Sequence, residues 1–213
     1  MSRGLFVALE GIDGSGKSTL MRRVKQNLVQ CGHDVVTVEE PGGTPAGDKI
    51  RHTLLDKTLQ LEPVAELFLF EASRHQLVQT VIRPALESKK IVLADRFTMS
   101  SVAYQGYGRG LSLELIETLN ELATGGLKPD LTVLLDLPVE LALQRKRGQR
   151  DRMEIAGLEF LQRVRSAYWE QIAQLNEDGL HLDATQSVEQ LTNMMMEKIR
   201  EKGEQYGILL RPR

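Results

Sequence analysis

Residues 11–18 read Gly11-Ile12-Asp13-Gly14-Ser15-Gly16-Lys17-Ser18 and match the pattern G-x-x-x-x-G-K-S/T at every fixed position. Glycines at both ends let the backbone turn with positive φ, so that successive N–H groups can point at the oxygens of a polyphosphate. The ammonium of Lys17 would face the outer phosphates, and the hydroxyl of Ser18 would bind Mg²⁺. The pattern therefore predicts a phosphate-binding loop.

The segments on either side of this loop favour the same interpretation over a chance match. Leu5–Leu9 is an unbroken apolar run, typical of a parallel strand that is buried on both faces. Leu20, Val24 and Leu28 recur every four residues, as on the buried side of a helix. Gly32 is placed to end that helix. Strand, loop and helix thus follow one another in the order that a phosphate loop requires.

Length and composition limit the class of protein. The 213 residues suit one α/β domain over residues 1–213 with a substantial core. The net charge is −2, so neither nucleic acid nor a membrane surface is an expected partner. Cys31 is the single cysteine, which excludes an intramolecular disulfide and is typical of a reducing cytoplasm. We recognise no signal peptide and no stretch of about 18 apolar residues that could span a membrane.

Four further apolar segments predict strands, at residues 35–38, 91–94, 131–135 and 180–182. Open parallel sheets bind ligands beyond the carboxyl ends of their strands. The pair Asp95-Arg96 would therefore stand beside the phosphate loop if the sheet is doubly wound. The loop Glu39–Thr44 also follows a strand, but its Pro-Gly-Gly sequence is equally typical of a simple turn.

Helices are expected at 45–57, at 62–88 with an interruption near Pro84, at 112–124, from Pro138 onward, at 158–176 and at 188–202. The glycine-rich segment Ser100–Gly110 predicts a mobile or tightly turned loop. Phe68 and Phe70, taken alone, are aromatics on an apolar helix and would normally pack in the core. Asp183 or Thr185 could cap the last helix. The tail, 203–213, has no clear periodicity and could be loose.

The segment 145–152 carries five cations in eight residues: Arg145, Lys146, Arg147, Arg150 and Arg152. Such a cluster is normally a solvated face. Beside a phosphate loop, however, it could close over a transferring phosphoryl group and neutralise the charge that develops there. We favour the second interpretation and predict a lid at about residues 144–154.

Several motifs occur together in an order that is typical of one enzyme family. They are residues 11–18, Glu40-Pro41-Gly42-Gly43-Thr44, Phe70 through Arg74, Asp95-Arg96-Phe97, Tyr104-Gln105-Gly106, Asp151-Arg152-Met153-Glu154 and Asp183-Ala184-Thr185. With them the chain resembles thymidylate kinase of the bacterial type over about residues 5–200. The resemblance implies a three-layer α/β P-loop NTPase fold, in which helices flank a five-stranded parallel sheet. It also implies transfer of the γ-phosphoryl group of ATP to dTMP with Mg²⁺, in a cytoplasmic homodimer.

The resemblance further implies roles on the acceptor side. Asp13 would contact the sugar 3′-hydroxyl, Phe70 would stack on thymine, and Arg74 would hydrogen-bond the base. Ser101 would assist at the base edge, while Tyr104 would crowd the sugar so that a 2′-hydroxyl fits poorly. The expected dTMP-binding residues are Asp13, Glu40, Pro41, Phe70, Arg74, Arg96, Ser101, Tyr104 and Gln105.

On the donor side, adenine would lie between Arg145 and the loop at residues 183–185. Arg96 would grip the acceptor phosphate, with Asp95 orienting it and the hydrated Mg²⁺ that Ser18 also binds. The expected ATP-binding residues are Gly11, Ile12, Asp13, Gly14, Ser15, Gly16, Lys17, Ser18, Thr19, Arg145, Asp183, Ala184 and Thr185. The expected catalytic residues are Lys17, Asp95, Arg96, Arg147, Arg150 and Arg152.

Two departures from the family leave questions open. Glu39 stands where bacterial members often have arginine, so one acceptor-side contact could be absent or replaced. The phosphate loop also lacks the arginine of the eukaryotic kind, and the lid would have to provide it. The alternatives to a thymidylate kinase are a kinase for another deoxynucleotide or deoxynucleoside, and a nucleotide-dependent switch. Against a guanine-nucleotide switch, the chain has no Asn-Lys-x-Asp sequence.

Overall fold

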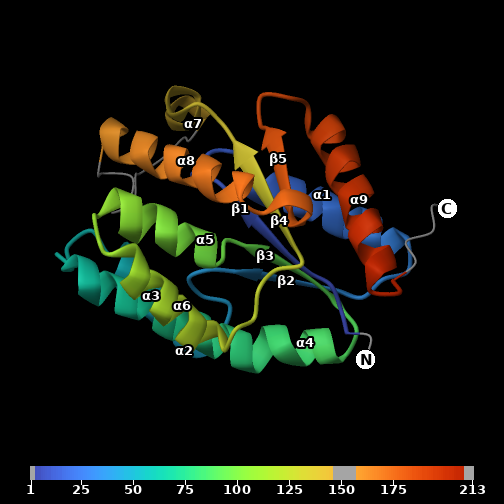
Figure 1. The fold of residues 1–213 in the computed structure, drawn as a ribbon, viewed down its shortest axis with the longest axis horizontal. Coiled ribbons are helices and arrows are strands. Elements are labelled where there is room, and N and C mark those ends of the chain that lie inside the picture. Colours follow the sequence, from blue (N-terminus) through green and yellow to red (C-terminus); the bar gives the residue numbers. More distant parts are fainter. Residues whose placement is uncertain (1–2, 146–156, 209–213) are drawn as a thin grey trace.

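A parallel sheet of five strands lies at the centre of the computed structural model, which describes residues 3–145 and 157–208 (Figure 1). The strands are β1 (Phe6–Glu10), β2 (Val35–Glu39), β3 (Ile91–Asp95), β4 (Leu131–Asp136) and β5 (Gly179–Asp183), in the order β2-β3-β1-β4-β5. All neighbouring strands are parallel. The predicted α/β fold with a five-stranded parallel sheet is therefore confirmed.

Each strand ends on an acidic residue, one position beyond the apolar segment seen in the sequence: Glu10, Glu39, Asp95, Asp136 and Asp183. The pairing register places Leu9 opposite Asp95 and Glu10 opposite Leu134, so the carboxyl ends of three strands meet at one edge. The phosphate loop begins at this edge, directly after β1. The expected juxtaposition of residues 95–96 with the loop is therefore confirmed.

Helices cover both faces of the sheet. They are α1 (Lys17–Gln30), α2 (Pro45–Leu55), α3 (Pro63–Leu77), α4 (Arg83–Glu87), α5 (Thr98–Ser101), α6 (Leu113–Thr124), α7 (Val139–Arg145), α8 (Leu158–Ala173) and α9 (Val188–Gln205). Among the described residues, the π-helical η1 (Val78–Ile82) follows α3, the π-helical η2 (Val102–Gly108) follows α5, and the 3₁₀ helix η4 (Asn176–Asp178) precedes β5. Figure 1 shows α4 on one side of the sheet and α1 with α9 on the other. Among the described residues, no helix is both long and apolar enough to cross a membrane.

Alternation along β1 explains the two apolar cores. Phe6 and Ala8 belong to the buried cluster formed with α3, η1 and α4. Val7 and Leu9 belong to the cluster formed with α1, α8 and α9. Because side chains alternate between the faces of a strand, an unbroken apolar run supplies both cores at once.

The helix expected over residues 62–88 is interrupted, as predicted, but by a wider π-helical turn and not by a break in the helix. The π turn η1 follows α3 directly, and Pro84 lies in the first turn of α4. Proline is tolerated there because its missing N–H needs no partner at the start of a helix.

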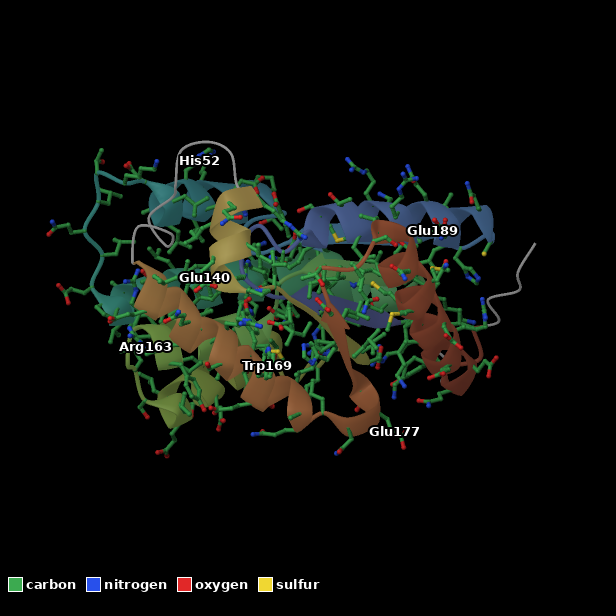
Figure 2. The ribbon with its side chains drawn as sticks, turned by 90° about the horizontal axis from the view of Figure 1, so that it is seen from above. His52, Glu140, Arg163, Trp169, Glu177 and Glu189 are labelled. Carbon is green, nitrogen blue, oxygen red and sulfur yellow. The ribbon has the colours of Figure 1, made fainter. Side chains whose placement is uncertain are left out.

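The predicted loop at residues 100–110 is wrong, because α5 and η2 form a continuous helical segment from Thr98 to Gly108. A Cβ at Gly108 would lie 2.6 Å from Cε2 of Phe160, and one at Gly106 would lie 2.7 Å from Cδ2 of Leu113. These two glycines therefore permit close packing instead of chain flexibility. Arg163 of α8 donates to the carbonyls of Tyr107 and Gly108 at 3.3 and 3.2 Å, which joins α8 to η2 (Figure 2).

The last helix begins at Val188 as expected, but its capping residue and its C-terminal end differ from expectation. Its N-cap is Ser187, which forms a capping box with Gln190, whereas Thr185 donates to Asp183 in the preceding turn. The helix continues to Gln205, and the guanidinium of Arg3 lies 5.2 Å from the ring centroid of Tyr206. The part of the tail up to Ile208 is thus packed against the N-terminal segment, and 209–213 lie outside the described residues.

Candidate active site

The phosphate loop has the backbone that its glycines permit. Gly11 has φ +134°, and a Cβ there would lie 2.4 Å from the carbonyl oxygen of Leu135. Gly16 has φ +103° and forms the N-cap of α1, with no atom within 4 Å of the Cβ it lacks. The loop therefore opens toward the N-terminus of α1, where backbone N–H groups and the helix dipole favour an anion.

Lys17 and Ser18 bring a positive charge and a hydroxyl to this loop. Lys17 is buried, and its ammonium donates to the carbonyls of Gly11 and Ile12 at 2.9 and 3.2 Å. Burial lowers the pKa of Lys17, as does the charge of Arg96, while Asp95 and Asp13 oppose the shift. Nζ lies 3.9 Å from a carboxylate oxygen of each of these two aspartates.

The donor set suits Mg²⁺ bound together with a polyphosphate. Ser18 Oγ donates to Asp95 Oδ2 at 3.1 Å, so a hydroxyl and a carboxylate lie side by side at the loop. Mg²⁺ prefers such hard oxygen ligands and usually completes its shell with phosphates and water. No group of three or more His, Cys, Asp or Glu side chains that could hold a metal occurs among the described residues. Among the described residues, the hydroxyl oxygen of Ser15 in the phosphate loop is buried without a hydrogen-bond partner.

A cavity of about 180 Å³ lies beside the loop. The structure brings all nine expected dTMP-binding residues to its wall, together with three residues that were not expected. The lining residues are Asp13, Glu40, Pro41, Arg51, Leu55, Phe70, Arg74, Arg96, Ser100, Ser101, Tyr104 and Gln105. Phe70 is half-buried at the cavity and Phe68 is 54% exposed, so the core placement expected for these aromatics is wrong.

Arg74 of α3 lies almost wholly inside the protein, with 1% of its surface exposed. Its Nε donates to Glu40 Oε2 at 2.8 Å, and its Nη2 donates to the carbonyl of Phe97 at 3.1 Å. Its Nη1 donates to three side-chain oxygens, which belong to Glu71 (2.6 Å), Ser101 (2.9 Å) and Asn120 (2.6 Å). Burial raises the pKa of Glu40 from 4.5 to about 7, although the charge and hydrogen bond of Arg74 oppose the shift.

Arg96 joins the cavity to the phosphate loop. Its Nη2 donates to Asp13 Oδ1 at 2.7 Å and to the hydroxyl of Tyr104 at 3.3 Å. Its Nη1 donates to Ser100 Oγ at 3.2 Å and to the hydroxyl of Tyr168 at 2.9 Å. Arg96 also has φ +77°, which is unfavourable for a residue with a side chain. The surrounding contacts therefore hold the backbone and the guanidinium together in one orientation.

Glu10 and Tyr168 form a second layer behind Arg96 that the sequence did not indicate. Glu10 is fully buried and accepts hydrogen bonds from the N–H of Phe97 at 2.8 Å and from Ser100 Oγ at 2.6 Å. Burial raises the pKa of Glu10, against the hydrogen bond from Ser100 and the charge of Arg96. Tyr168 of α8 lies 2.7 Å from Ser100 Oγ through its hydroxyl, and burial raises its pKa well above the usual value.

Arg145 and Ala184, two of the residues expected on the donor side, meet at the end of α7. Nη1 of Arg145, the last residue of α7, donates to the carbonyl of Ala184 at 3.1 Å. The expected pair of Arg145 and the loop at residues 183–185 is thus brought together. The expected lid residues Arg147, Arg150 and Arg152 lie outside the described residues.

Arg51 is the clearest residue that sequence reasoning missed. It reaches the cavity from α2, donates to the carbonyl of Pro41 at 2.6 Å and lies 3.7 Å from Glu39 Oε2. An arginine from α2 therefore lies next to the position where family members often carry arginine. The sequence feature that could have indicated this arginine is Glu39, because a carboxylate close to an expected anion site is favourable only when a cation lies nearby.

Comparison with known proteins agrees with this geometry. The sequence profile of the family described as "Thymidylate kinase" matches residues 9–195. The chain is 47% identical over 205 residues to the thymidylate kinase of Deinococcus radiodurans, covering 95% of this chain and 100% of that protein. It is 47% identical over 196 residues to the thymidylate kinase of Kosmotoga olearia, covering 91% and 94%. It is 48% identical over 205 residues to that of Halothermothrix orenii, covering 93% and 97%. The chain belongs to the thymidylate kinase family.

Proposed function

We propose that this protein transfers the γ-phosphoryl group of ATP to the 5′-phosphate of dTMP, giving dTDP and ADP. The observation that carries the proposal is that one cavity is lined by all nine residues expected to bind dTMP. Arg96 and Asp13 join that cavity to the phosphate loop through a hydrogen bond of 2.7 Å. The acceptor phosphate and the terminal phosphate of ATP would therefore approach each other at Arg96.

The reaction needs positioning and charge neutralisation more than proton transfer. The second pKa of a phosphate monoester is about 6, so the attacking oxygen of dTMP is already anionic at neutral pH. This oxygen forms a bond to the γ-phosphorus while the bond from that phosphorus to the bridging oxygen breaks, and ADP leaves with the electron pair. Lys17 would face the transferred group and Arg96 the acceptor phosphate. Mg²⁺, held by Ser18 and through water by Asp95, would supply further positive charge between the phosphates when bound.

An arginine is still required at the transferring group, because Asp13, Gly14 and Ser15 of the phosphate loop supply none. We assign this role to one of the three lid arginines, at positions 147, 150 and 152. An arginine acting in this way accelerates phosphoryl transfer by about 10³- to 10⁵-fold in related enzymes. Replacing each of the three singly with alanine should lower kcat sharply in at least one variant. Three variants with near-normal kcat would remove the lid from the mechanism.

The function is tested by ADP release from Mg·ATP with dTMP, dUMP, dCMP, dGMP, AMP or UMP in separate reactions. We expect a strong response to dTMP that disappears in Lys17→Ala. ADP release without any added monophosphate would instead support a nucleotide-dependent switch. A strong response to a different monophosphate alone would support the alternative kinase.

The resemblance also implies a homodimer that acts in the cytoplasm, and we include both in the proposal. The lone Cys31 suits a reducing compartment. Phe68 on α3 and Leu122 on α6 are 54% and 73% exposed, although both are large and apolar. These two helices pack together, so their apolar side chains would suit contact with a second copy.

A further inference from the structure

Glu71 of α3 determines how the hydroxyl of Ser101 is oriented at the cavity. Ser101 Oγ donates to Glu71 Oε1 at 3.0 Å and accepts from Nη1 of Arg74 at 2.9 Å. A guanidinium can only donate and a carboxylate can only accept, so neither bond can be reversed. The single hydroxyl proton of Ser101 is therefore directed at Glu71, away from any ligand.

A ligand in the cavity consequently meets Ser101 as an acceptor. A hydroxyl oxygen has two acceptor positions, and Arg74 uses one of them. Arg74 itself has five N–H groups, of which Nε donates to Glu40 and the pair on Nη1 donates to Glu71, Ser101 and Asn120. Nη2 donates to the carbonyl of Phe97, which leaves its second N–H for a ligand. The wall of the cavity thus presents one donor beside one acceptor.

Glu66, also on α3, acts on Gln105 by the same chemistry. Nε2 of Gln105 donates to Glu66 Oε1 at 2.8 Å, and both residues are buried. One N–H of the Gln105 amide is held by this bond, so a buried carboxylate of α3 also fixes how this amide is oriented. A second side chain of the cavity wall is therefore oriented by an acid of the same helix.

We propose that Glu71 is a specificity-determining residue that fixes Ser101 as a hydrogen-bond acceptor, so that the cavity selects a pyrimidine carrying N3–H beside a C4 carbonyl. Thymine and uracil have this edge. Cytosine has the opposite one, with an acceptor at N3 and an amino donor at C4, and it would meet an acceptor at Ser101 and a donor at Arg74. This inference rests on the proposed function, because it places the base at Arg74 and Ser101.

Burying the carboxylate of Glu71 costs free energy, so filling space would not by itself explain a glutamate at this position. Glu71 is 6% exposed, and its Oε2 is buried without a hydrogen-bond partner among the described residues. An unsatisfied buried carboxylate oxygen disfavours folding, although the other oxygen of Glu71 pairs with the buried guanidinium of Arg74 at 2.6 Å. The orientation of Ser101 and Arg74 gives the carboxylate a reason to be there.

Substitutions at position 71 test the proposal through the ratio of kcat/KM for dTMP to that for dCMP. Glu71→Met removes the acceptor, frees the Ser101 proton to meet N3 of cytosine, and should lower the ratio by about tenfold or more. Glu71→Gln keeps a neutral acceptor and should lower it less. Asn120→Ala is the matched control, because Asn120 accepts from the same Nη1 of Arg74 but makes no bond to Ser101. It should weaken binding of both nucleotides and leave the ratio unchanged.

A double-variant comparison separates this role from a merely structural one. Ser101→Ala should lower the ratio by itself, and Glu71→Met should not change the ratio further in that background. A folded Glu71→Met enzyme with the wild-type ratio would overturn the proposal, as would a full Glu71 effect in the absence of Ser101. If Glu71→Met does not fold, an unchanged ratio in Ser101→Ala overturns it equally.

The proposed function is judged separately, by whether the wild-type protein phosphorylates dTMP at all. When turnover is too slow to follow, the ratio of the equilibrium dissociation constants for dCMP and dTMP, measured without ATP, is compared between variants in place of the ratio of kcat/KM. Preserved selective binding without phosphoryl transfer would contradict the kinase proposal and leave the role of Glu71 in place.

Discussion

Arg96 shows how a single residue can carry a strained backbone at a site. A side chain at positive φ costs about 1–2 kcal/mol relative to ordinary backbone. Against this, the Arg96 guanidinium makes four side-chain hydrogen bonds, to Asp13, Ser100, Tyr104 and Tyr168. The orientation in which Arg96 would face the acceptor phosphate is therefore set before a ligand arrives, which reduces the ordering that binding must impose.

The hydroxyl of Tyr168 should matter for acceptor binding although it lies behind Arg96. We expect Tyr168→Phe to lower kcat/KM for dTMP by about tenfold, because a hydrogen bond to a charged group contributes about 1.5–3 kcal/mol. Steady-state kinetics with varied dTMP would measure this effect. Tyr107→Phe is the control, since that hydroxyl also contacts α8, through Glu170, but on the exposed surface. Equal losses in the two variants would contradict a specific role for Tyr168.

Glu40 should make the stability of the protein depend on pH. Because burial raises the pKa of Glu40 to about 7, the folded protein binds a proton between pH 4.5 and 7 that the unfolded chain releases. The contribution of this group to the free energy of unfolding is therefore largest below pH 4.5 and is lost as the pH rises to 7. The loss should be on the order of 3 kcal/mol.

Urea unfolding of the wild-type protein and Glu40→Gln at several pH values between 5 and 8 would measure this dependence. The glutamine variant should show a smaller fall in stability across that range, whatever its absolute stability. Parallel pH curves for the two proteins would show that Glu40 does not titrate in this window.

At the scale of elements, helix α8 connects parts of the site that are distant in the chain. Arg165 makes a bidentate pair with Asp136 at the end of β4, with distances of 2.7 and 2.8 Å. Tyr168 reaches Arg96 after β3, and Phe160 packs against Gly108 of η2. The helix that follows the arginine-rich segment is thus fixed to two strand ends and to the turn beneath the cavity.

The contact between η2 and α8 should not tolerate a methyl group. We expect Gly108→Ala to lower the free energy of unfolding by about 1–3 kcal/mol, because the added Cβ would lie 2.6 Å from Phe160. Thermal or urea unfolding would measure the change. Phe160→Leu should remove part of the clash, so the cost of the alanine should be smaller in that background. An equal cost in both backgrounds would point to backbone conformation instead of packing.

For the whole molecule, the notable feature is that the proposed phosphate site lies at an edge where all five strands end in acids. Each acid is compensated locally. Asp95 accepts from Ser18, Asp136 pairs with Arg165, and Asp183 accepts from Thr185. Glu10 accepts from Ser100, and Glu39 lies near Arg51. Binding of phosphates here therefore depends on local donors and on the dipole of α1, since the net charge is −2.

The exposed apolar residues of α3 and α6 lead to a prediction about assembly. We expect sedimentation equilibrium to give twice the 23.9 kDa of one chain. Leu122→Glu should shift the protein toward the monomer, because burying an unpaired carboxylate in an interface is unfavourable. Val29→Glu is the matched control, since Val29 is 52% exposed on α1, away from α3 and α6. Dissociation by both substitutions, or a monomeric wild-type protein, would contradict this interface.

Local patterns in the sequence were sufficient for the sheet, the phosphate loop and most of the helices. Apolar runs, helical spacing and the glycine pattern each depend on neighbouring residues, so they can be interpreted without a structure. The family motifs likewise indicated the residues that the fold gathers around the cavity. The prediction failed at Ser100–Gly110, where glycine allows close packing, because composition alone does not distinguish packing from flexibility.

The supporting contacts of the site depended on the tertiary structure alone. Glu10 meets Ser100 across 90 positions of the chain, and Arg96 meets Tyr168 across 72. Glu71 and Ser101, 30 positions apart, acquire a role only because α3 packs beside the segment that follows β3. Such pairs leave no local periodicity in the sequence, since their partners are chosen by burial and hydrogen bonding between elements that the fold brings together.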